Sequence, residues 1–404
     1  MIIKESTCQY LQLFSLLLLP WGLFFFEALA SIVIIIFALP VLIFARQVPL
    51  DQVLRQCWPF LVIFAIILVS GFWSRDTDRW LGMLRVNLPY VMLPFSFYLW
   101  PQFLKKRRRL FQRQFIFAGA ALTLYLIYKL FFHGEEILTG IREGGSFQMP
   151  VQHVRTSLFL AVAGLFGWDE WLRHRWNSRN SLLYGMLLLV VIAGIHLLAV
   201  RTGLALFYTG TLITFIFNKK FHTRQGLTWM VVFVVVVAVS LLTIPTIREK
   251  WAYFVEDFRN YESHSWWFYS DAVRWKSNLM GWEIFKASPW WGVGMGDLVD
   301  EMHLQFYLRE NIRIHEYPHN LWITFLAGSG LVGFCVLNVA LGQIFIQLKK
   351  HGELVYAVII FIYMVSCLVE TTLLTSLGAI SFVVIGLLAT CAYGEGDPHS
   401  RGQS

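Results

Sequence analysis

Two arginine residues, Arg201 and Arg274, have positions at which a positive charge requires either an ion-pair partner or a ligand. Arg201 lies in Ala-Val-Arg-Thr-Gly, at the junction of two apolar runs, and an ionisable residue at membrane depth is a functional candidate. Arg274 lies three residues after Asp271. Arginine stays charged and binds phosphate through a planar fork of donors, so both residues could bind an anion. The alternatives are a snorkelling contact with lipid headgroups for Arg201 and an ion pair with Asp271 for Arg274.

A histidine pair follows in His-Glu-Tyr-Pro-His-Asn, from His315 to Asn320, which matches the zinc-protease pattern H-E-x-x-H. That pattern binds zinc only on a continuous helix, which places both histidines on one face. Pro318 opposes such a helix, because proline removes a backbone hydrogen bond and clashes with the preceding turn. Proline is favoured at a helix start, so we expect a helix to begin near Pro318 and no metal to bind.

The segment from Ser288 to Asp297 reads Ser-Pro-Trp-Trp-Gly-Val-Gly-Met-Gly-Asp, with glycines spaced as in a nucleotide-binding fingerprint. That function needs a strand–turn–helix unit around the glycines, and the surrounding sequence predicts none. We therefore expect a tight turn after a helix, in which the glycines allow close backbone packing.

The composition is that of a membrane protein, with 57% hydrophobic, 17% aromatic and only 14% charged residues. Repeated apolar runs predict an all-α integral membrane protein of about twelve transmembrane helices, since a helix needs roughly 20 apolar residues to cross a bilayer. The predicted spans are 9–26, 28–45, 58–73, 81–100, 114–132, 155–172, 182–200, 202–218, 227–246, 319–347, 353–373 and 377–393.

Short basic clusters between these spans set the predicted orientation. In the twelve-helix arrangement every cluster falls on one side, which the positive-inside rule assigns to the cytoplasm. The net charge of +8 therefore does not predict nucleic-acid binding. The clusters are Arg46 and Arg55; residues 105–109 with Arg113; Arg173, Arg175 and Arg179; Lys219, Lys220 and Arg224; and Lys349 and Lys350.

The opposite side holds two loops. The larger, 247–318, is rich in tryptophan and charge, and its periodicity over 270–285 predicts a helix. The smaller, 133–154, carries His153, with Arg155 at its edge. The chain then divides into transmembrane helices one to nine (1–246), a periplasmic loop domain containing helices (247–318), transmembrane helices ten to twelve (319–393) and a disordered cytoplasmic tail (394–404).

Taken in order, these motifs resemble those of the bacterial O-antigen ligase and polymerase superfamily. That family shows an arginine-bearing helix, a Pro-then-Gly-x-Gly turn, and a His-Asn pair that opens a membrane helix with a glycine-rich stretch. It also carries an arginine in the short periplasmic turn between helices seven and eight, which Arg201 matches. His315 precedes His319 by four residues, whereas relatives often place the two histidines closer together. The other matching positions are Arg274, Pro289–Gly296, His319–Asn320 and Ala327–Gly333.

The resemblance implies an inverting, metal-independent glycosyltransferase without a cofactor, in the bacterial inner membrane and facing the periplasm. Its donor would be an O-antigen glycan on undecaprenyl diphosphate, and its acceptor a hydroxyl of lipid A–core. Arg201 and Arg274 would bind the diphosphate, and His319 would be the base. The supporting candidates are Asn320, His315, His153 and Arg155.

Three alternatives stay open from the sequence. An O-antigen polymerase would join lipid-linked repeat units with the same donor. A transporter or flippase is disfavoured because the notable polar residues cluster at one face of the predicted membrane protein. An intramembrane zinc protease is opposed by Pro318.

Overall fold

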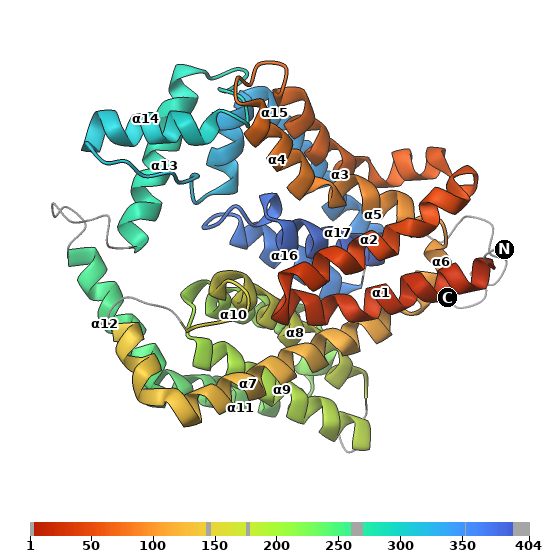
Figure 1. Ribbon diagram of the computed structural model, residues 1–404. Helices are drawn as coiled ribbons and strands as arrows, with labels where there is room; N and C mark the ends of the chain where they lie inside the picture. The colour runs from red at the N-terminus through yellow and green to blue at the C-terminus, as the bar shows by residue number, and fades with distance from the viewer. Residues whose placement is uncertain (1–3, 143–146, 175–177, 260–269, 352, 391–404) are drawn as a thin grey trace.

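The computed structural model describes residues 4–142, 147–174, 178–259, 270–351 and 353–390, and within these ranges the chain forms only helices and connecting turns (Figure 1). The predicted all-α class is confirmed. The α-helices are α1 (Glu5–Phe25), α2 (Glu27–Phe44), α3 (Leu50–Ser70), α4 (Thr77–Asn87), α5 (Pro89–Phe97), α6 (Pro101–Lys106), α7 (Arg108–Arg142), α8 (His153–Arg173), α9 (Arg179–Leu198), α10 (Arg201–Phe217), α11 (Arg224–Thr243), α12 (Pro245–Arg259), α13 (Ser270–Ala287), α14 (Leu298–Glu310), α15 (Leu321–His351), α16 (Leu354–Ser366) and α17 (Ser376–Thr390).

Six of the described helices are long and apolar enough to cross a membrane. Shorter apolar helices follow in α10, α11, α16 and α17, so the chain has the composition of a multi-pass membrane protein. The count of twelve spans stays a prediction. The six are Glu5–Phe25, Glu27–Gln47, Leu50–Ser70, Arg108–Ile141, Arg179–Leu198 and Leu321–Lys350.

Several predicted boundaries differ from the structure, among them the span predicted at 58–73, which is α3 and begins at Leu50. The span predicted at 81–100 is two helices, α4 and α5, which separate at Leu88 because the residue before a proline disfavours a continuous helix. The loop predicted at 133–154 begins as helix, since α7 kinks at His133 and continues to Arg142. The span predicted at 353–373 ends earlier, at Ser366. The predicted tail, 394–404, lies outside the described residues.

The centre of the bundle is formed by α16 and α17, which lie between the N-terminal helices and the pair α8 and α10 (Figure 1). Every residue of α17 from Leu377 to Thr390 is buried. Nearly all of α8 is buried too, although it carries charges near its end. Those charges are paired: Arg113 lies 3.1 Å from Glu170, and Arg173 lies 2.9 Å from Asp169. The polar groups of this helix are thus neutralised inside the protein.

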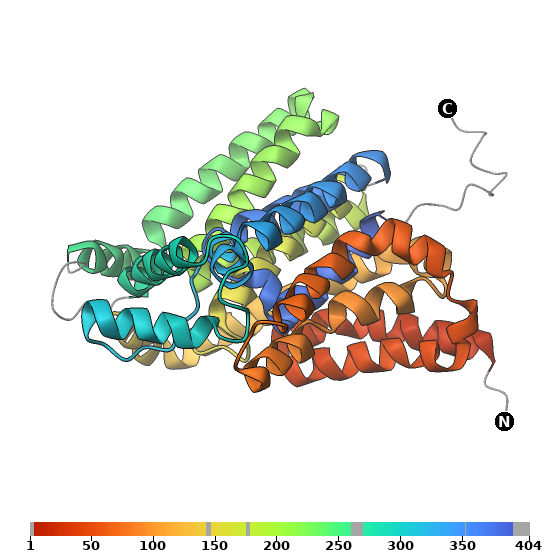
Figure 2. The same ribbon diagram turned by 90° about the horizontal axis from the view of Figure 1, so that it is seen from above.

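The predicted loop domain is largely helical. It forms α12, α13 and α14, and the helix predicted over 270–285 is present as α13. Figure 2 shows α13 and α14 at one side of the bundle, away from the chain termini. Gly281 on α13 has no room for a side chain, because a Cβ there would meet Pro318 and Ile323. The helix therefore lies close against the start of α15.

The glycine turn after α13 inserts into a break in α15. The break is at Gly330, whose φ of 66° and ψ of −171° interrupt the helix. The backbone N–H groups of Val293 and Gly294 donate to the carbonyls of Ala327 and Gly328, at 3.0 Å each. In return, the N–H of Leu331 donates to the carbonyl of Pro289 at 2.8 Å. The predicted tight turn with close backbone packing is confirmed, and its partner is the glycine-rich stretch of α15.

Replacing Gly330 with alanine should destabilise the protein. The φ of 66° strains any residue with a Cβ, and that atom would overlap the backbone of Trp290. We expect Gly330→Ala to lower the free energy of unfolding by more than about 1 kcal/mol, measured by thermal unfolding of the purified protein in detergent. Gly342→Ala, in the same helix, is the matched control, because a Cβ there would meet nothing within 4 Å. Equal unfolding temperatures for the two variants would contradict the interlock.

Candidate functional site

Arg201 and Arg274 are brought together by one carboxylate. Arg201 is the first residue of α10, just after a tight turn in which Ala199 adopts a left-handed conformation with a φ of 49°. Its guanidinium lies 2.7 Å from one oxygen of Asp271, and the other oxygen of Asp271 lies 3.4 Å from the guanidinium of Arg274. Phe254 of α12 packs against Arg201, with its ring centroid 4.7 Å from the guanidinium carbon. The ion pair considered for Arg274 in the sequence is therefore present, and it includes Arg201.

A second carboxylate continues the chain of charges to His319. Glu370 lies in the turn after α16, with one oxygen 3.1 Å from Arg274 and the other 3.5 Å from Nδ1 of His319. Burial alone would raise the pKa of Glu370, but its hydrogen bond with His319 and the charge of Arg274 bring it below its usual value. Glu370 is therefore a carboxylate that faces a histidine and an arginine at once.

Asn320 caps α15, which begins at Leu321, three residues later than the preference of proline for the first helical position predicts. Its side-chain oxygen accepts hydrogen bonds from the N–H groups of Trp322 and Ile323, at 2.9 and 3.2 Å, as an N-cap residue does. Its amide also donates to the carbonyl of Leu368 at 3.0 Å. Asn320 thus ties the start of α15 to the turn that carries Glu370. His319 precedes the cap and lies outside the helix.

Lys250 of α12 is a third basic residue near Arg201 and Arg274. Burial lowers the pKa of Lys250, and the charges of Arg201 and Arg274 lower it further. His153, at the start of α8, has its pKa lowered by burial and then by Lys250 and Arg274. Both pKa values are thus lowered by burial and by the nearby positive charges, which favours a neutral His153.

The charged chain brings basic and acidic side chains together at one place. Arg201 and Arg274 are paired with Asp271 and Glu370, and Lys250 lies near both arginines. An anionic group with more than one negative charge would complement this arrangement, because arginine forms paired hydrogen bonds with phosphate oxygens. His319, at one end of the chain, would then be within reach of a bound ligand as a proton acceptor.

Arg155 lies beside the charged chain. With Glu370 and Thr202 it lines a cavity of about 70 Å³ between α8, α10 and the turn after α16. Its guanidinium is 3.7 Å from Glu27, at the start of α2. The hydroxyl groups of Thr371 and Thr372 add to the polar lining. Arg155 therefore lines the same cavity as Glu370, but its ion pair is with Glu27, outside the charged chain.

His315 lies apart from the charged chain, in the non-helical segment before α15. It stacks on His303 of α14, with ring centroids 4.2 Å apart. Glu316 is the second neighbour of His319, 3.7 Å from its Nε2. The expectation that these residues do not form one helix is confirmed, so the geometry of the H-E-x-x-H motif is not made.

Asp297, another acidic residue close to the glycine turn, has a structural role. Its carboxylate accepts hydrogen bonds from the backbone N–H groups of Arg75 and Asp76, at 2.7 to 2.9 Å. It thereby fastens the turn between α3 and α4 to the start of α14, and both of its oxygens are occupied.

Sequence reasoning missed Glu370 and Lys250. The position of Glu370 did carry a signal, because it is an ionisable residue near the end of the apolar run 353–373, as Arg201 is at the junction of two others. Lys250 had none, since it stands among other charged residues of a hydrophilic segment.

No curated protein matches the chain. Residues 186–337 match the family model described as O-Antigen ligase. The matched segment runs from within α9 into the second part of α15, and it contains Arg201, Arg274 and His319. It therefore includes the arginines and the histidine of the charged chain, and identifies this part of the protein as a domain of the O-antigen ligase superfamily.

Proposed function

We propose that the protein is an O-antigen ligase, a glycosyltransferase that moves a glycan from undecaprenyl diphosphate to a hydroxyl of lipid A–core. The observation that carries the proposal is the continuous chain of charges from Arg201 through Asp271, Arg274 and Glu370 to His319. It joins groups suited to bind a diphosphate with a group suited to take a proton. The family match supports an activity on lipid-linked sugars.

In this proposal Arg201 and Arg274 bind the donor diphosphate. The bond between the anomeric carbon and the phosphate oxygen breaks during transfer, and negative charge develops on the departing diphosphate. Two guanidinium groups stabilise that charge, with Lys250 adding to the positive field, so the step needs no metal ion. The donor must exchange places with Asp271, which holds both arginines in the free protein.

His319 then acts on the acceptor. With Nδ1 facing Glu370, its Nε2 takes the proton of the acceptor hydroxyl, and the hydroxyl oxygen attacks the anomeric carbon on the face opposite the diphosphate. The configuration of the sugar is inverted. Glu370 orients the imidazole and stabilises its protonated form, as a carboxylate does for the histidine of a catalytic triad.

The proposed location is the bacterial inner membrane, with the site on the periplasmic side. The support is the distribution of basic clusters in the sequence, which assigns the opposite ends of the helices to the cytoplasm. A periplasmic enzyme has no supply of nucleotides, so the energy for transfer has to arrive in the lipid-linked donor itself.

The acceptor separates the proposed ligase from a polymerase that uses the same donor. In a deletion strain, a ligase defect should remove all O-antigen ladder bands from a lipopolysaccharide gel, while lipid-linked polymer accumulates. A strain that still attaches a single repeat unit would show instead that the protein extends the polymer.

Conservative changes of the two arginines should be poorly tolerated. Lysine keeps the charge but cannot form the paired hydrogen bonds of a guanidinium, so Arg201→Lys and Arg274→Lys should each cut transfer by about tenfold or more. Transfer is measured with purified protein in excess chelator. Arg248→Lys is the matched control, because the Arg248 side chain is 77% exposed. Near-normal transfer by both site variants would assign these arginines a structural role.

Removal of the two histidines should have unequal effects. His319→Ala should reduce transfer by about 10²- to 10⁴-fold, the usual contribution of a general base, while donor binding is largely retained. His315→Ala should be milder, because His315 packs against His303 away from the charged chain. An inactive His315 variant beside an active His319 variant would reverse the assignment.

Glu370→Gln should lower the free energy of unfolding by an amount that depends on pH. At pH 7 the loss of the carboxylate between Arg274 and His319 should lower the free energy of unfolding by about 1–3 kcal/mol. Because the pKa of Glu370 is lowered from 4.5 in the folded protein, its contribution is complete above that pH and is lost as the pH falls through the folded value. The difference between variant and wild type in thermal unfolding should therefore narrow below pH 4.5. Glu136→Gln, at a side chain that is 79% exposed, is the control and should change little. A difference that does not depend on pH would argue against an ionised Glu370.

A further inference from the structure

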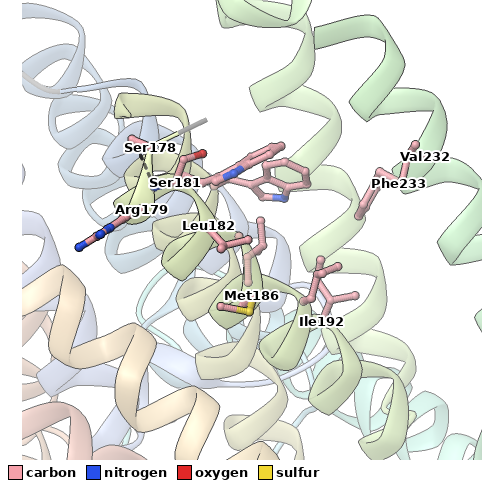
Figure 3. A pocket seen from close by; sticks show the side chains of 13 residues that line it. Ser178, Arg179, Ser181, Leu182, Met186, Ile192, Val232 and Phe233 are labelled. Atoms are coloured by element: carbon pink, nitrogen blue, oxygen red, sulfur yellow. Dashed lines mark hydrogen bonds between the residues drawn. The ribbon is translucent and has the colours of Figure 1, made fainter. Parts of the chain in front are cut away.

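An apolar groove of about 440 Å³ runs along α9, between α8 and α11 (Figure 3). Its wall on α9 includes Leu182, Met186 and Leu189, whose side chains are 65%, 51% and 58% exposed. The lining extends from Ser178 to Ile192, about 20 Å of helix. One leaflet of a bilayer has a hydrocarbon depth of about 15 Å, half the thickness of the core, so the groove is long enough to follow a lipid chain.

Two polar groups inside the groove have no hydrogen-bond partner within the described part of the chain. They are the hydroxyl of Ser181 and the indole N–H of Trp168, and both side chains are buried, with 1% and 3% exposed. The rings of Phe215, Phe221 and Phe233 surround Trp168 and offer no conventional acceptor. Buried donors are nearly always paired, so these two indicate a ligand that brings oxygen acceptors into the groove.

The rim of the groove is positively charged. Arg179 stands at the first turn of α9, and Figure 3 shows its guanidinium extending outward from the apolar wall. It forms no ion pair with any residue that the structure describes. The two acidic residues of α8, Asp169 and Glu170, are paired with Arg173 and Arg113. The N-terminus of α9 itself also favours an anion.

We propose that this groove binds one anionic phospholipid. Its phosphate lies at Arg179 and the N-terminus of α9, its ester oxygens accept hydrogen bonds from Ser181 and Trp168, and one acyl chain follows Met186 and Leu189. Basic pockets between membrane helices bind acidic lipid headgroups in this manner.

The lipid groove is separate from the charged chain. The rim is at the start of α9, whereas Arg201 follows the end of that helix, and twenty residues of helix span about 30 Å. That distance is close to the thickness of the hydrocarbon core, so the lipid would lie in the leaflet opposite the proposed transfer site.

Binding is tested by native mass spectrometry of the purified full-length protein, titrated with dioleoyl phosphatidylglycerol. Dioleoyl phosphatidylcholine, with the same chains and no net charge, is the matched lipid. The wild type should bind a first phosphatidylglycerol about tenfold more tightly than phosphatidylcholine, because a charge-assisted contact is lost with the neutral headgroup. Arg179→Gln should remove that preference, and Arg55→Gln, at an exposed arginine of α3, should keep it.

A second variant tests the apolar part of the groove. Leu182→Trp keeps Arg179 but fills the space along α9, and it should weaken the binding of both lipids. Equal binding of the two lipids by the wild type, or an unchanged preference in Arg179→Gln, would show that the groove holds only non-specific lipid. Lipid binding is read without any glycan transfer, so the result does not depend on the proposed activity.

Discussion

The interlock between the glycine turn and the broken helix α15 is the constraint on which the arrangement of the site depends. A helix break leaves backbone groups without partners, and at Gly330 the turn from Pro289 to Gly294 supplies them. The same turn is the end of α13, the helix of Arg274. One set of backbone hydrogen bonds thus fixes α13 against α15, and with them Arg274 near His319. The glycine stretches at 292–296 and 327–333 therefore belong to one packed contact between α13 and α15.

Ion pairs also hold α13 against its neighbours. Charges that are partly withdrawn from water need partners, and here each carboxylate serves two basic side chains. Asp271 joins α13 to α10, and Glu370 joins α13 to the segment before α15. The cations that we propose to bind the donor are in this way paired within the protein. A ligand therefore competes with carboxylates of the protein and not only with water, which favours ligands that carry more than one negative charge.

Much of this arrangement could be predicted from the sequence, and the exceptions have physical causes. Arg201 was visible because charges are rare beside apolar runs, and Arg274 because it takes its place in the order of motifs that resembles the superfamily. Pro318 correctly predicted that the histidine motif is not helical. The helix break at Gly330 was not visible, since a glycine within an apolar run is common in membrane helices. Glu370 carried a signal beside its apolar run, but its partner Arg274, 3.1 Å away, lies in a segment distant in sequence, and local patterns do not encode such contacts. Lys250 gave no local signal at all.

The left-handed conformation of Ala199 affects how firmly Arg201 is held at the start of α10. A glycine would adopt this conformation freely, whereas alanine does so at a cost of about 1–2 kcal/mol, and in return its methyl group restricts the turn to few other shapes. The corner between α9 and α10 is therefore stiff. Much of the conformational entropy that a flexible corner would lose on ligand binding is lost already when the chain folds. The position of Arg201 is thus fixed by a strained residue two positions before it.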